Sequence, residues 1–281
     1  MAASTAALRG ITKQYKNFTL GPVDMTVPAG SIVGLIGENG AGKTTLLKIL
    51  CGVNRADDGT VDLLGGSPAD AATRAKIGVV FEDAFFYGSF TAAQVARSLA
   101  GMYGARWNAD SFSAYLRRFG LDAGKKLKEY SRGMRLKLSL AAALAHDPEL
   151  LVLDEATAGL DPVVRGELLD LFLEFIQDER HSIVMSSHIT ADLEQIADSI
   201  AYLHNGQLLF QENKDDLLQE YGVLHCGEDV LTSLPAGLVV FTRRGAYGCE
   251  SLVRERRTVQ ELLPEAVCDA ARLDDIMRFY S

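Results

Sequence analysis

The residues with the clearest chemical meaning form a glycine-rich run in the first quarter of the chain. The run fits the phosphate-loop pattern G-x-x-x-x-G-K-[ST] at every fixed position. We expect Lys43 to reach the β- and γ-phosphates and Thr44 to place its hydroxyl on Mg²⁺. The run predicts nucleoside triphosphate binding, against the alternative of an ordinary glycine-rich turn. The predicted phosphate-binding residues are Gly37, Asn39, Gly40, Ala41, Gly42, Lys43, Thr44 and Thr45.

Two adjacent carboxylates form the second chemical feature. Asp154 and Glu155 directly follow the apolar run 150–153. A carboxylate at the C-terminal end of a buried strand faces the ligand crevice of an open α/β sheet. We expect Asp154 to hold Mg²⁺, directly or through water, and Glu155 to orient the attacking water. The alternative is a solvated Asp-Glu pair without a catalytic role, which is common when such a pair is the only motif. The phosphate loop in the same chain argues against this alternative.

Alternating strands and helices must position these residues. Apolar runs predict strands at 32–36, 60–64, 77–81, 150–153, 183–186 and 200–203. Helical spacing is found at 45–50, across 91–145, and at 163–177, where Asp161 can cap the helix and Pro162 can start it. This alternation predicts an α/β fold with a parallel sheet and helices on both faces.

The two ends of the chain lack this alternation. Strands are predicted at 8–13 and 23–27 before the phosphate loop. After about residue 211 we expect a small α+β appendage, residues 212–281. It would contain a polar helix at 212–220, a strand at 237–242 and a final helix at 273–280.

The composition is that of an ordinary globular protein. Of 281 residues, 48% are hydrophobic and 23% are charged, which supports a real core. The net charge of −9 argues against a general nucleic-acid binder, which needs a basic face, so no nucleic acid is expected as a partner. The four cysteines have no paired spacing, and reduced thiols in the cytoplasm are the simplest interpretation. The first residues lack the charged start and apolar core of a signal peptide.

Three further motifs narrow the class of phosphate-loop protein. Ser131 and Gly133 lie in the segment YSRGM, Asp161 lies in AGLDP, and His188 ends SSH after a predicted strand. With these motifs in this order, residues 8–210 resemble the ATP-binding subunits of ABC transporters. The segment YSRGM takes the place of the usual LSGGQ signature loop, and this form resembles bacterial exporter-type members. The resemblance implies an N-terminal antiparallel β subdomain and a helical subdomain over about 86–147, both within an ABC ATPase domain of residues 1–211.

The resemblance also implies a mechanism in which two chains pack head to tail around two ATP molecules and Mg²⁺. Ser131 and Gly133 of one chain would contact the γ-phosphate held by the other chain. His188 would contact the γ-phosphate and help to hold the attacking water, and Asp161 would bridge the two chains. The plainer alternatives are a hydrogen-bonded loop histidine for His188 and a helix cap for Asp161, which could serve both roles.

The roles of two further residues, Tyr15 and Glu82, rest on single positions rather than on motifs. Tyr15 matches the aromatic residue that stacks on adenine in this family, although a single tyrosine in a β segment can simply be packing. Glu82 stands where the family has a glutamine near Mg²⁺. We hypothesise that Glu82 keeps this metal-linked role and makes the nucleotide-free site more repulsive, because three carboxylates around one ion disfavour one another's charge. A drifted linker residue is the alternative.

The resemblance finally implies partners. The chain would be an ATPase that drives a separate integral-membrane permease, as an exporter, and would lie at the inner face of the membrane as a peripheral cytoplasmic subunit. Its second subunit would be another copy of itself or a related ATPase. The aromatic segment 85–90, with Met102, Tyr103 and Trp107, would form partly core and partly permease contact. The alternative function is an ABC-type ATP-dependent switch that is not coupled to transport and is either regulatory or associated with nucleic acid or ribosomes.

Overall fold

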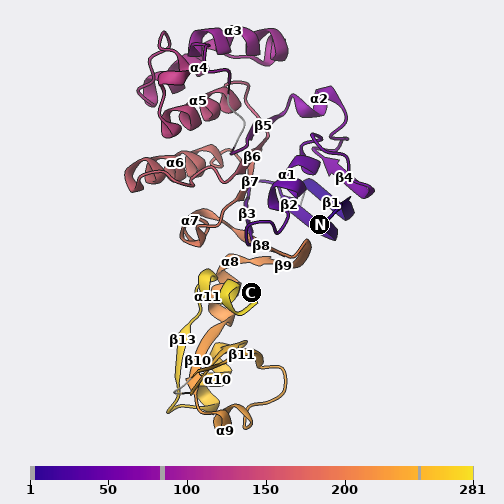
Figure 1. Cartoon of the computed structure of the whole chain (residues 1–281), viewed down its shortest axis with the longest axis vertical. Helices are drawn as coiled ribbons and strands as arrows, with labels where there is room; N and C mark the ends of the chain where they lie inside the picture. Colours follow the sequence, from indigo (N-terminus) through magenta and orange to yellow (C-terminus); the bar gives the residue numbers. More distant parts are fainter. Residues whose placement is uncertain (1–3, 83–85, 246–247, 281) are drawn as a thin grey trace.

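The computed structural model describes residues 4–82, 86–245 and 248–280. Figure 1 shows a larger part at the top, with a six-stranded sheet running through its middle. A separate C-terminal sheet, shown in orange and yellow, lies at the bottom end of the long axis. The central sheet has the strand order β5-β6-β7-β3-β8-β9, with every pair parallel except β8 and β9. Its strands are β3 (Ile32–Ile36), β5 (Ile77–Val80), β6 (Leu150–Asp154), β7 (Ser182–Ser186), β8 (Ser199–His204) and β9 (Gln207–Asn213).

The central sheet is buried on both faces. Along a strand, successive side chains point to opposite faces. Val33 and Leu35 therefore join one core with α1 and the N-terminal sheet, while Ile32 and Ile36 join a second core with the helices α5 to α7. The predicted parallel sheet covered on both faces is confirmed. The covering helices are α1 (Lys43–Leu50), α6 (Pro162–Phe175) and α7 (Thr190–Ile196), together with α5 from the helical part.

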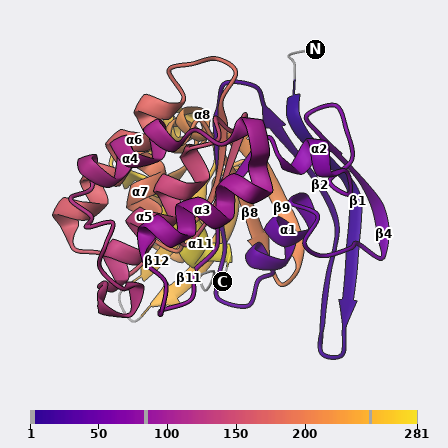
Figure 2. The same cartoon turned by 90° about the horizontal axis from the view of Figure 1, so that it is seen from above.

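An antiparallel sheet covers the α1 side. Its strand order is β2-β1-β4, and Figure 2 shows its long strands side by side at one edge of the molecule. The first two strands are longer than the sequence predicted. β1 already begins at Ser4 and contains the buried residues Thr5, Ala6 and Ala7, and both strands continue into the mostly exposed residues beside the turn that connects them. The bounds are β1 (Ser4–Tyr15), β2 (Phe18–Pro28) and β4 (Asp58–Leu63), with the short helix α2 (Ala71–Arg74) following β4.

The segment between β5 and β6 is helical, as predicted. Its own core includes Val95, Phe112, Leu116 and Leu138. Thr91 begins the first helix with a capping box, in which its hydroxyl accepts from the Gln94 N–H and the Gln94 side chain accepts from the Thr91 N–H. The elements are α3 (Ala92–Tyr103), η1 (Gly104–Arg106), α4 (Ala109–Arg118), η2 (Leu127–Glu129) and α5 (Arg132–Leu144).

The C-terminal part is a four-stranded antiparallel sheet of order β11-β12-β10-β13 with short helices. Its last helix, α11, packs against the larger part, since Ile276 and Phe279 join the core that contains α6 and α7. The elements are α8 (Lys214–Glu220), β10 (Gly222–Cys226), α9 (Glu228–Leu231), β11 (Val239–Gly245), β12 (Gly248–Val253), α10 (Arg256–Leu262), β13 (Val267–Ala270) and α11 (Leu273–Tyr280).

Two predicted boundaries in the C-terminal part were wrong. The strand expected at 237–242 is β11, Val239–Gly245, because the Leu238 N–H donates to the Pro235 carbonyl oxygen in a turn before it. The helix expected from residue 212 begins at Lys214, because Glu212 and Asn213 extend β9 and pair with β8. The Asn213 side chain then caps α8 by accepting from the N–H groups of Asp215 and Asp216. The division of the chain into residues 1–211 and 212–281 stays a proposal.

Candidate active site

The phosphate loop connects β3 to α1. Gly37 has φ +155°, and a Cβ there would collide with the Leu203 carbonyl oxygen. Gly42 precedes α1 with φ +108°, and its Cβ would lie 2.8 Å from the Phe18 ring. Only glycine combines such backbone angles with such close neighbours. The loop therefore turns tightly and delivers the chain to the helix N-terminus, as the sequence predicted.

Lys43, the first residue of α1, is almost completely buried. Its Nζ donates to the carbonyl oxygens of Gly37, at 2.7 Å, and Glu38, at 3.2 Å. It also lies 3.4 Å from Glu155 Oε1. The ammonium group is thus held inside the loop by its own backbone, where phosphate oxygens would compete with these carbonyls for its protons.

Thr44, Asp154 and Ser186 form a hydrogen-bonded cluster of oxygen atoms. The Thr44 hydroxyl donates to Asp154 Oδ2 at 2.8 Å, and the Ser186 hydroxyl donates to Asp154 Oδ1 at 2.6 Å. Parallel pairing of β6 with β7 places Asp154 and Ser186 opposite each other. Mg²⁺ prefers oxygen ligands and binds with one or two carboxylates plus phosphates and water, so the Thr44 and Asp154 oxygens fit this ion.

Glu155 is oriented from both sides. Its backbone has φ +53°, and its N–H donates to the carbonyl oxygen of Ser186 at 3.2 Å. Its Oε2 accepts from His188 Nδ1 at 2.6 Å, while its other oxygen faces Lys43. The structure thus brings together the two residues predicted to be catalytic. A carboxylate only accepts, so His188 Nδ1 carries the proton in this hydrogen bond.

Glu82 forms an ion pair that the sequence did not predict. Its Oε1 lies 3.1 Å from Nη2 of Arg132, the residue after Ser131 in the segment YSRGM. The guanidinium group of Arg132 also lies against Gly159. Glu82 and Glu155 line the same small cavity. The metal-linked role of Glu82 stays a prediction, and its charge is balanced by Arg132 rather than left unpaired.

Ser131 and Asp161 cap helices. The Ser131 hydroxyl accepts from the Met134 N–H at 3.2 Å at the start of α5, and Asp161 Oδ1 accepts from the Val164 N–H at 3.0 Å at the start of α6. Gly133 lies beside Leu160. The buried residues of α5 belong to the core on the face of the central sheet opposite to α1. The roles of Ser131, Gly133 and Asp161 toward a second chain stay predictions.

Tyr15 ends β1 with a ring that is 45% exposed. Its ring centroid lies 6.4 Å from that of Phe18, the residue against Gly42. Its hydroxyl accepts from the Asn54 side chain at 3.4 Å. An exposed ring near the phosphate loop is compatible with stacking on adenine, and this role stays a prediction.

The predicted aromatic segment is divided between core and surface. Phe86, Phe90 and Trp107 pack into the core of the helical part, whereas Tyr87 and Met102 are 78% and 79% exposed. Phe85 lies outside the described residues. In the part of the chain that the structure describes, no helix has the length and apolar character needed to cross a bilayer.

Comparisons with known proteins agree with this geometry. The family model described as ABC transporter matches residues 20–158. The bacitracin transport ATP-binding protein BcrA of Enterococcus faecalis is 36% identical over 212 residues, covering 74% of this chain and 68% of that protein. The lantibiotic transport ATP-binding protein SrtF of Streptococcus pyogenes is 33% identical over 211 residues, covering 74% and 90%.

A solved structure of the ATP binding subunit of an ABC transporter has a TM-score of 0.69 and 28% identity, covering 76% of this chain and 92% of that one. The match to an ABC transporter ATP-binding protein of Synechocystis spans 58% of the length of that relative. With the phosphate loop, the Asp154–Glu155 pair and His188 in one site, the chain belongs to the ATP-binding proteins of ABC transporters and is an ABC-type ATPase.

Proposed function

We propose that this chain is the ATP-hydrolysing subunit of an exporter, working as a dimer on a separate membrane permease. The observation that carries the proposal is the orientation of Glu155, whose two carboxylate oxygens face Lys43 and His188. A carboxylate held between a phosphate-binding cation and a histidine can polarise a water molecule aimed at the γ-phosphate.

The residues predicted to bind phosphate and Mg²⁺, or to act across a dimer, then have these roles. Lys43 and the loop N–H groups bind the phosphates, and Thr44 and Asp154 would hold Mg²⁺. The ion supplies charge neutralisation at the β- and γ-phosphates. Ser131 and Gly133, at the start of α5, would complete the site of a second chain, as the resemblance to the family implies. A dimer around two ATP molecules follows, with Asp161 near the junction.

The catalytic part of the proposal is tested by Glu155→Gln in the full chain with ATP and Mg²⁺. We expect hydrolysis to fall by at least about 100-fold, since the group that orients water is lost. A stable ATP-bound dimer should then appear in light scattering. Glu167→Gln is a matched control, because Glu167 is an exposed carboxylate that pairs with Lys137, away from the predicted catalytic residues, and should leave both readouts unchanged. A monomer with normal ATP turnover would contradict the catalytic role.

The permease is proposed to dock on the helical part. Phe86 and Leu99 of this part line a pocket of about 290 Å³ together with Val79 of β5. Tyr87 and Met102 are exposed on the helical part. An amphipathic helix of a partner can insert apolar side chains into such a groove. The names of the bacitracin and lantibiotic transport relatives support peptide antibiotics as the class of cargo.

Met102→Asp tests this docking surface. We expect the variant to lose at least about tenfold in the yield of permease recovered from detergent-solubilised membranes, because a buried charge opposes docking. ATP-dependent dimerisation of the Glu155→Gln form should be unaffected. Val53→Asp is a matched control, since Val53 is also an exposed apolar residue but lies next to α1. Full recovery of the permease with Met102→Asp would contradict the proposed surface.

A further inference from the structure

The C-terminal sheet places two thiols directly opposite each other. Cys226 ends β10 and pairs in register with Cys249 on β12, in an antiparallel ladder. Residues directly opposite in such a ladder have Cα atoms about 4.5–5.5 Å apart and side chains on the same face. A disulfide needs Cα atoms about 4.4–6.8 Å apart. The backbone therefore already has the spacing of a cross-strand disulfide.

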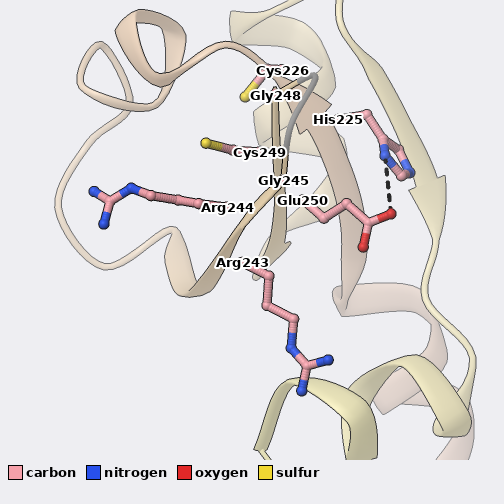
Figure 3. A pocket seen from close by; sticks show the side chains of 8 residues that line it. All are labelled: His225, Cys226, Arg243, Arg244, Gly245, Gly248, Cys249 and Glu250. Atoms are coloured by element: carbon pink, nitrogen blue, oxygen red, sulfur yellow. Dashed lines mark ion pairs between the residues drawn. The ribbon is translucent and has the colours of Figure 1, made fainter.

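Figure 3 shows the two side chains together. The sulfur atoms of Cys226 and Cys249 extend to the same side of the sheet, with Arg244 next in the row on β11. His225 and Glu250 extend to the other side, where His225 Nδ1 lies 3.8 Å from Glu250 Oε1. Both cysteines are free thiols in this structure. The two thiols are therefore neighbours on one face of the sheet, and the His225–Glu250 ion pair lies on the other face.

The other two cysteines do not compete for this pairing. Cys51 follows α1 in the core of the larger part, and burial raises the pKa of its thiol to about 12. Cys268 lies on β13, and its sulfur is directed to Gly222, at the opposite end of β10 from Cys226. Cys249 is therefore the partner that the fold gives to Cys226.

The pair is accessible from one side. Cys226 and Cys249 both line a surface pocket of about 530 Å³, and Cys226 also lines a neighbouring pocket with Val230 and Leu262. Cys249 is 5% exposed, whereas Cys226 is partly exposed. A small thiol reagent entering from solvent reaches Cys226 first and has Cys249 next to it.

We propose that Cys226 and Cys249 form a dithiol site that small disulfides oxidise to a cross-strand disulfide. The Cys226 thiolate attacks one sulfur of the small disulfide, which forms a mixed disulfide and releases one small thiol. The Cys249 thiolate then attacks Cys226 Sγ and releases the second small thiol. Two protein thiols are oxidised and one small disulfide is reduced. The site lies outside the ATPase machinery and does not depend on the proposed function.

The reaction should be slow at neutral pH and faster in alkali. Burial, and then the neighbouring thiol of Cys249, raise the pKa of Cys226 above its ordinary value of 9.0. Only the thiolate is nucleophilic, so the rate of the first step should keep rising as pH passes 9. This behaviour describes a slow modification site rather than a fast catalytic thiol.

The test is to treat the full native chain with oxidised glutathione, count free thiols and map disulfides in peptides prepared without reduction. We expect free thiols to fall from four to two, with one intramolecular link between residues 226 and 249. Cys268→Ser should keep this link, and Cys249→Ser should stop at a glutathione adduct on Cys226. A link from Cys226 to Cys268, or an adduct on Cys226 in the unmutated chain without any link, would overturn the proposal.

Discussion

At the residue scale, the active site depends on a buried carboxylate with two hydroxyl donors. The sequence identified Thr44 and Asp154 from motif positions, and both lie in the cluster. It did not identify Ser186, because a serine at the end of an apolar run carries no signal of its own. Ser186 and Asp154 are far apart in the chain, and only the pairing of β6 with β7 places them against each other.

Ser186→Ala should therefore weaken the site. Asp154 is 2% exposed and would lose a 2.6 Å hydrogen bond, and the Glu155 N–H would lose the Ser186 hydroxyl at 3.1 Å. We expect a loss of about 1–3 kcal/mol in the free energy of unfolding, the usual result for an unsatisfied buried group. The Mg²⁺ concentration for half-maximal ATPase activity should also rise. Urea unfolding and a Mg²⁺ titration measure the two effects.

Ser98→Ala is the control for this substitution. Ser98 is an exposed residue of α3 whose hydroxyl donates to the Gln94 carbonyl oxygen, so both quantities should stay near those of the unmutated chain. Equal effects from the two substitutions would contradict the role given to Ser186.

At the element scale, the sequence predicted those helices and strands that the hydrophobic pattern of their own residues indicates. The helix 273–280 and the strands around the phosphate loop coincide with α11, β3 and β6. The strand order of the C-terminal sheet was beyond prediction, since β10 lies between two strands that follow it in the chain. Such an order is decided by long-range pairing and not by the residues of one strand.

The ion pair between Glu82 and Arg132 also belongs to this scale, because it connects the end of one element to the start of another. Glu82 follows β5, Arg132 begins α5, and both side chains are about half exposed. Double-mutant cycles on exposed ion pairs give about 0.2–1 kcal/mol. For Glu82→Gln and Arg132→Gln we expect a coupling free energy in this range in nucleotide-free protein, measured by urea unfolding. It should fall at high salt, because exposed charges are screened.

Nucleotide should change this coupling. If Glu82 turns towards Mg²⁺, the coupling with Arg132 is lost when ATP and Mg²⁺ are added in the Glu155→Gln background. The ion pair of Arg118 with Glu174, at 2.6 Å and equally exposed, is the control and should keep its coupling. A Glu82–Arg132 coupling that persists with nucleotide would reject the metal-linked role of Glu82.

At the scale of the whole molecule, α11 joins the two parts of the chain. Leu273, Ile276 and Phe279 are buried in the core that also contains α6 and α7. The Thr190 hydroxyl at the start of α7 donates to Asp274 Oδ1 at 2.6 Å. The same helix contacts β11 and β12 of the C-terminal sheet. A destabilising substitution in α11 should consequently lower the stability of both the larger part and the C-terminal sheet.

Ile276→Ala tests this connection. Ile276 is fully buried, and removing its side chain should cost about 2–5 kcal/mol in the free energy of unfolding. The fluorescence of Trp107, the only tryptophan in the chain, reports on the helical part, and hydrogen exchange in β10 and β12 reports on the C-terminal sheet. Because one core spans the junction, we expect both signals to shift to lower urea together. Leu262→Ala, at a half-exposed residue of α10, should shift neither by more than about 0.5 kcal/mol. A shift confined to the C-terminal sheet would mean that the two parts unfold independently and that α11 belongs to only one of them.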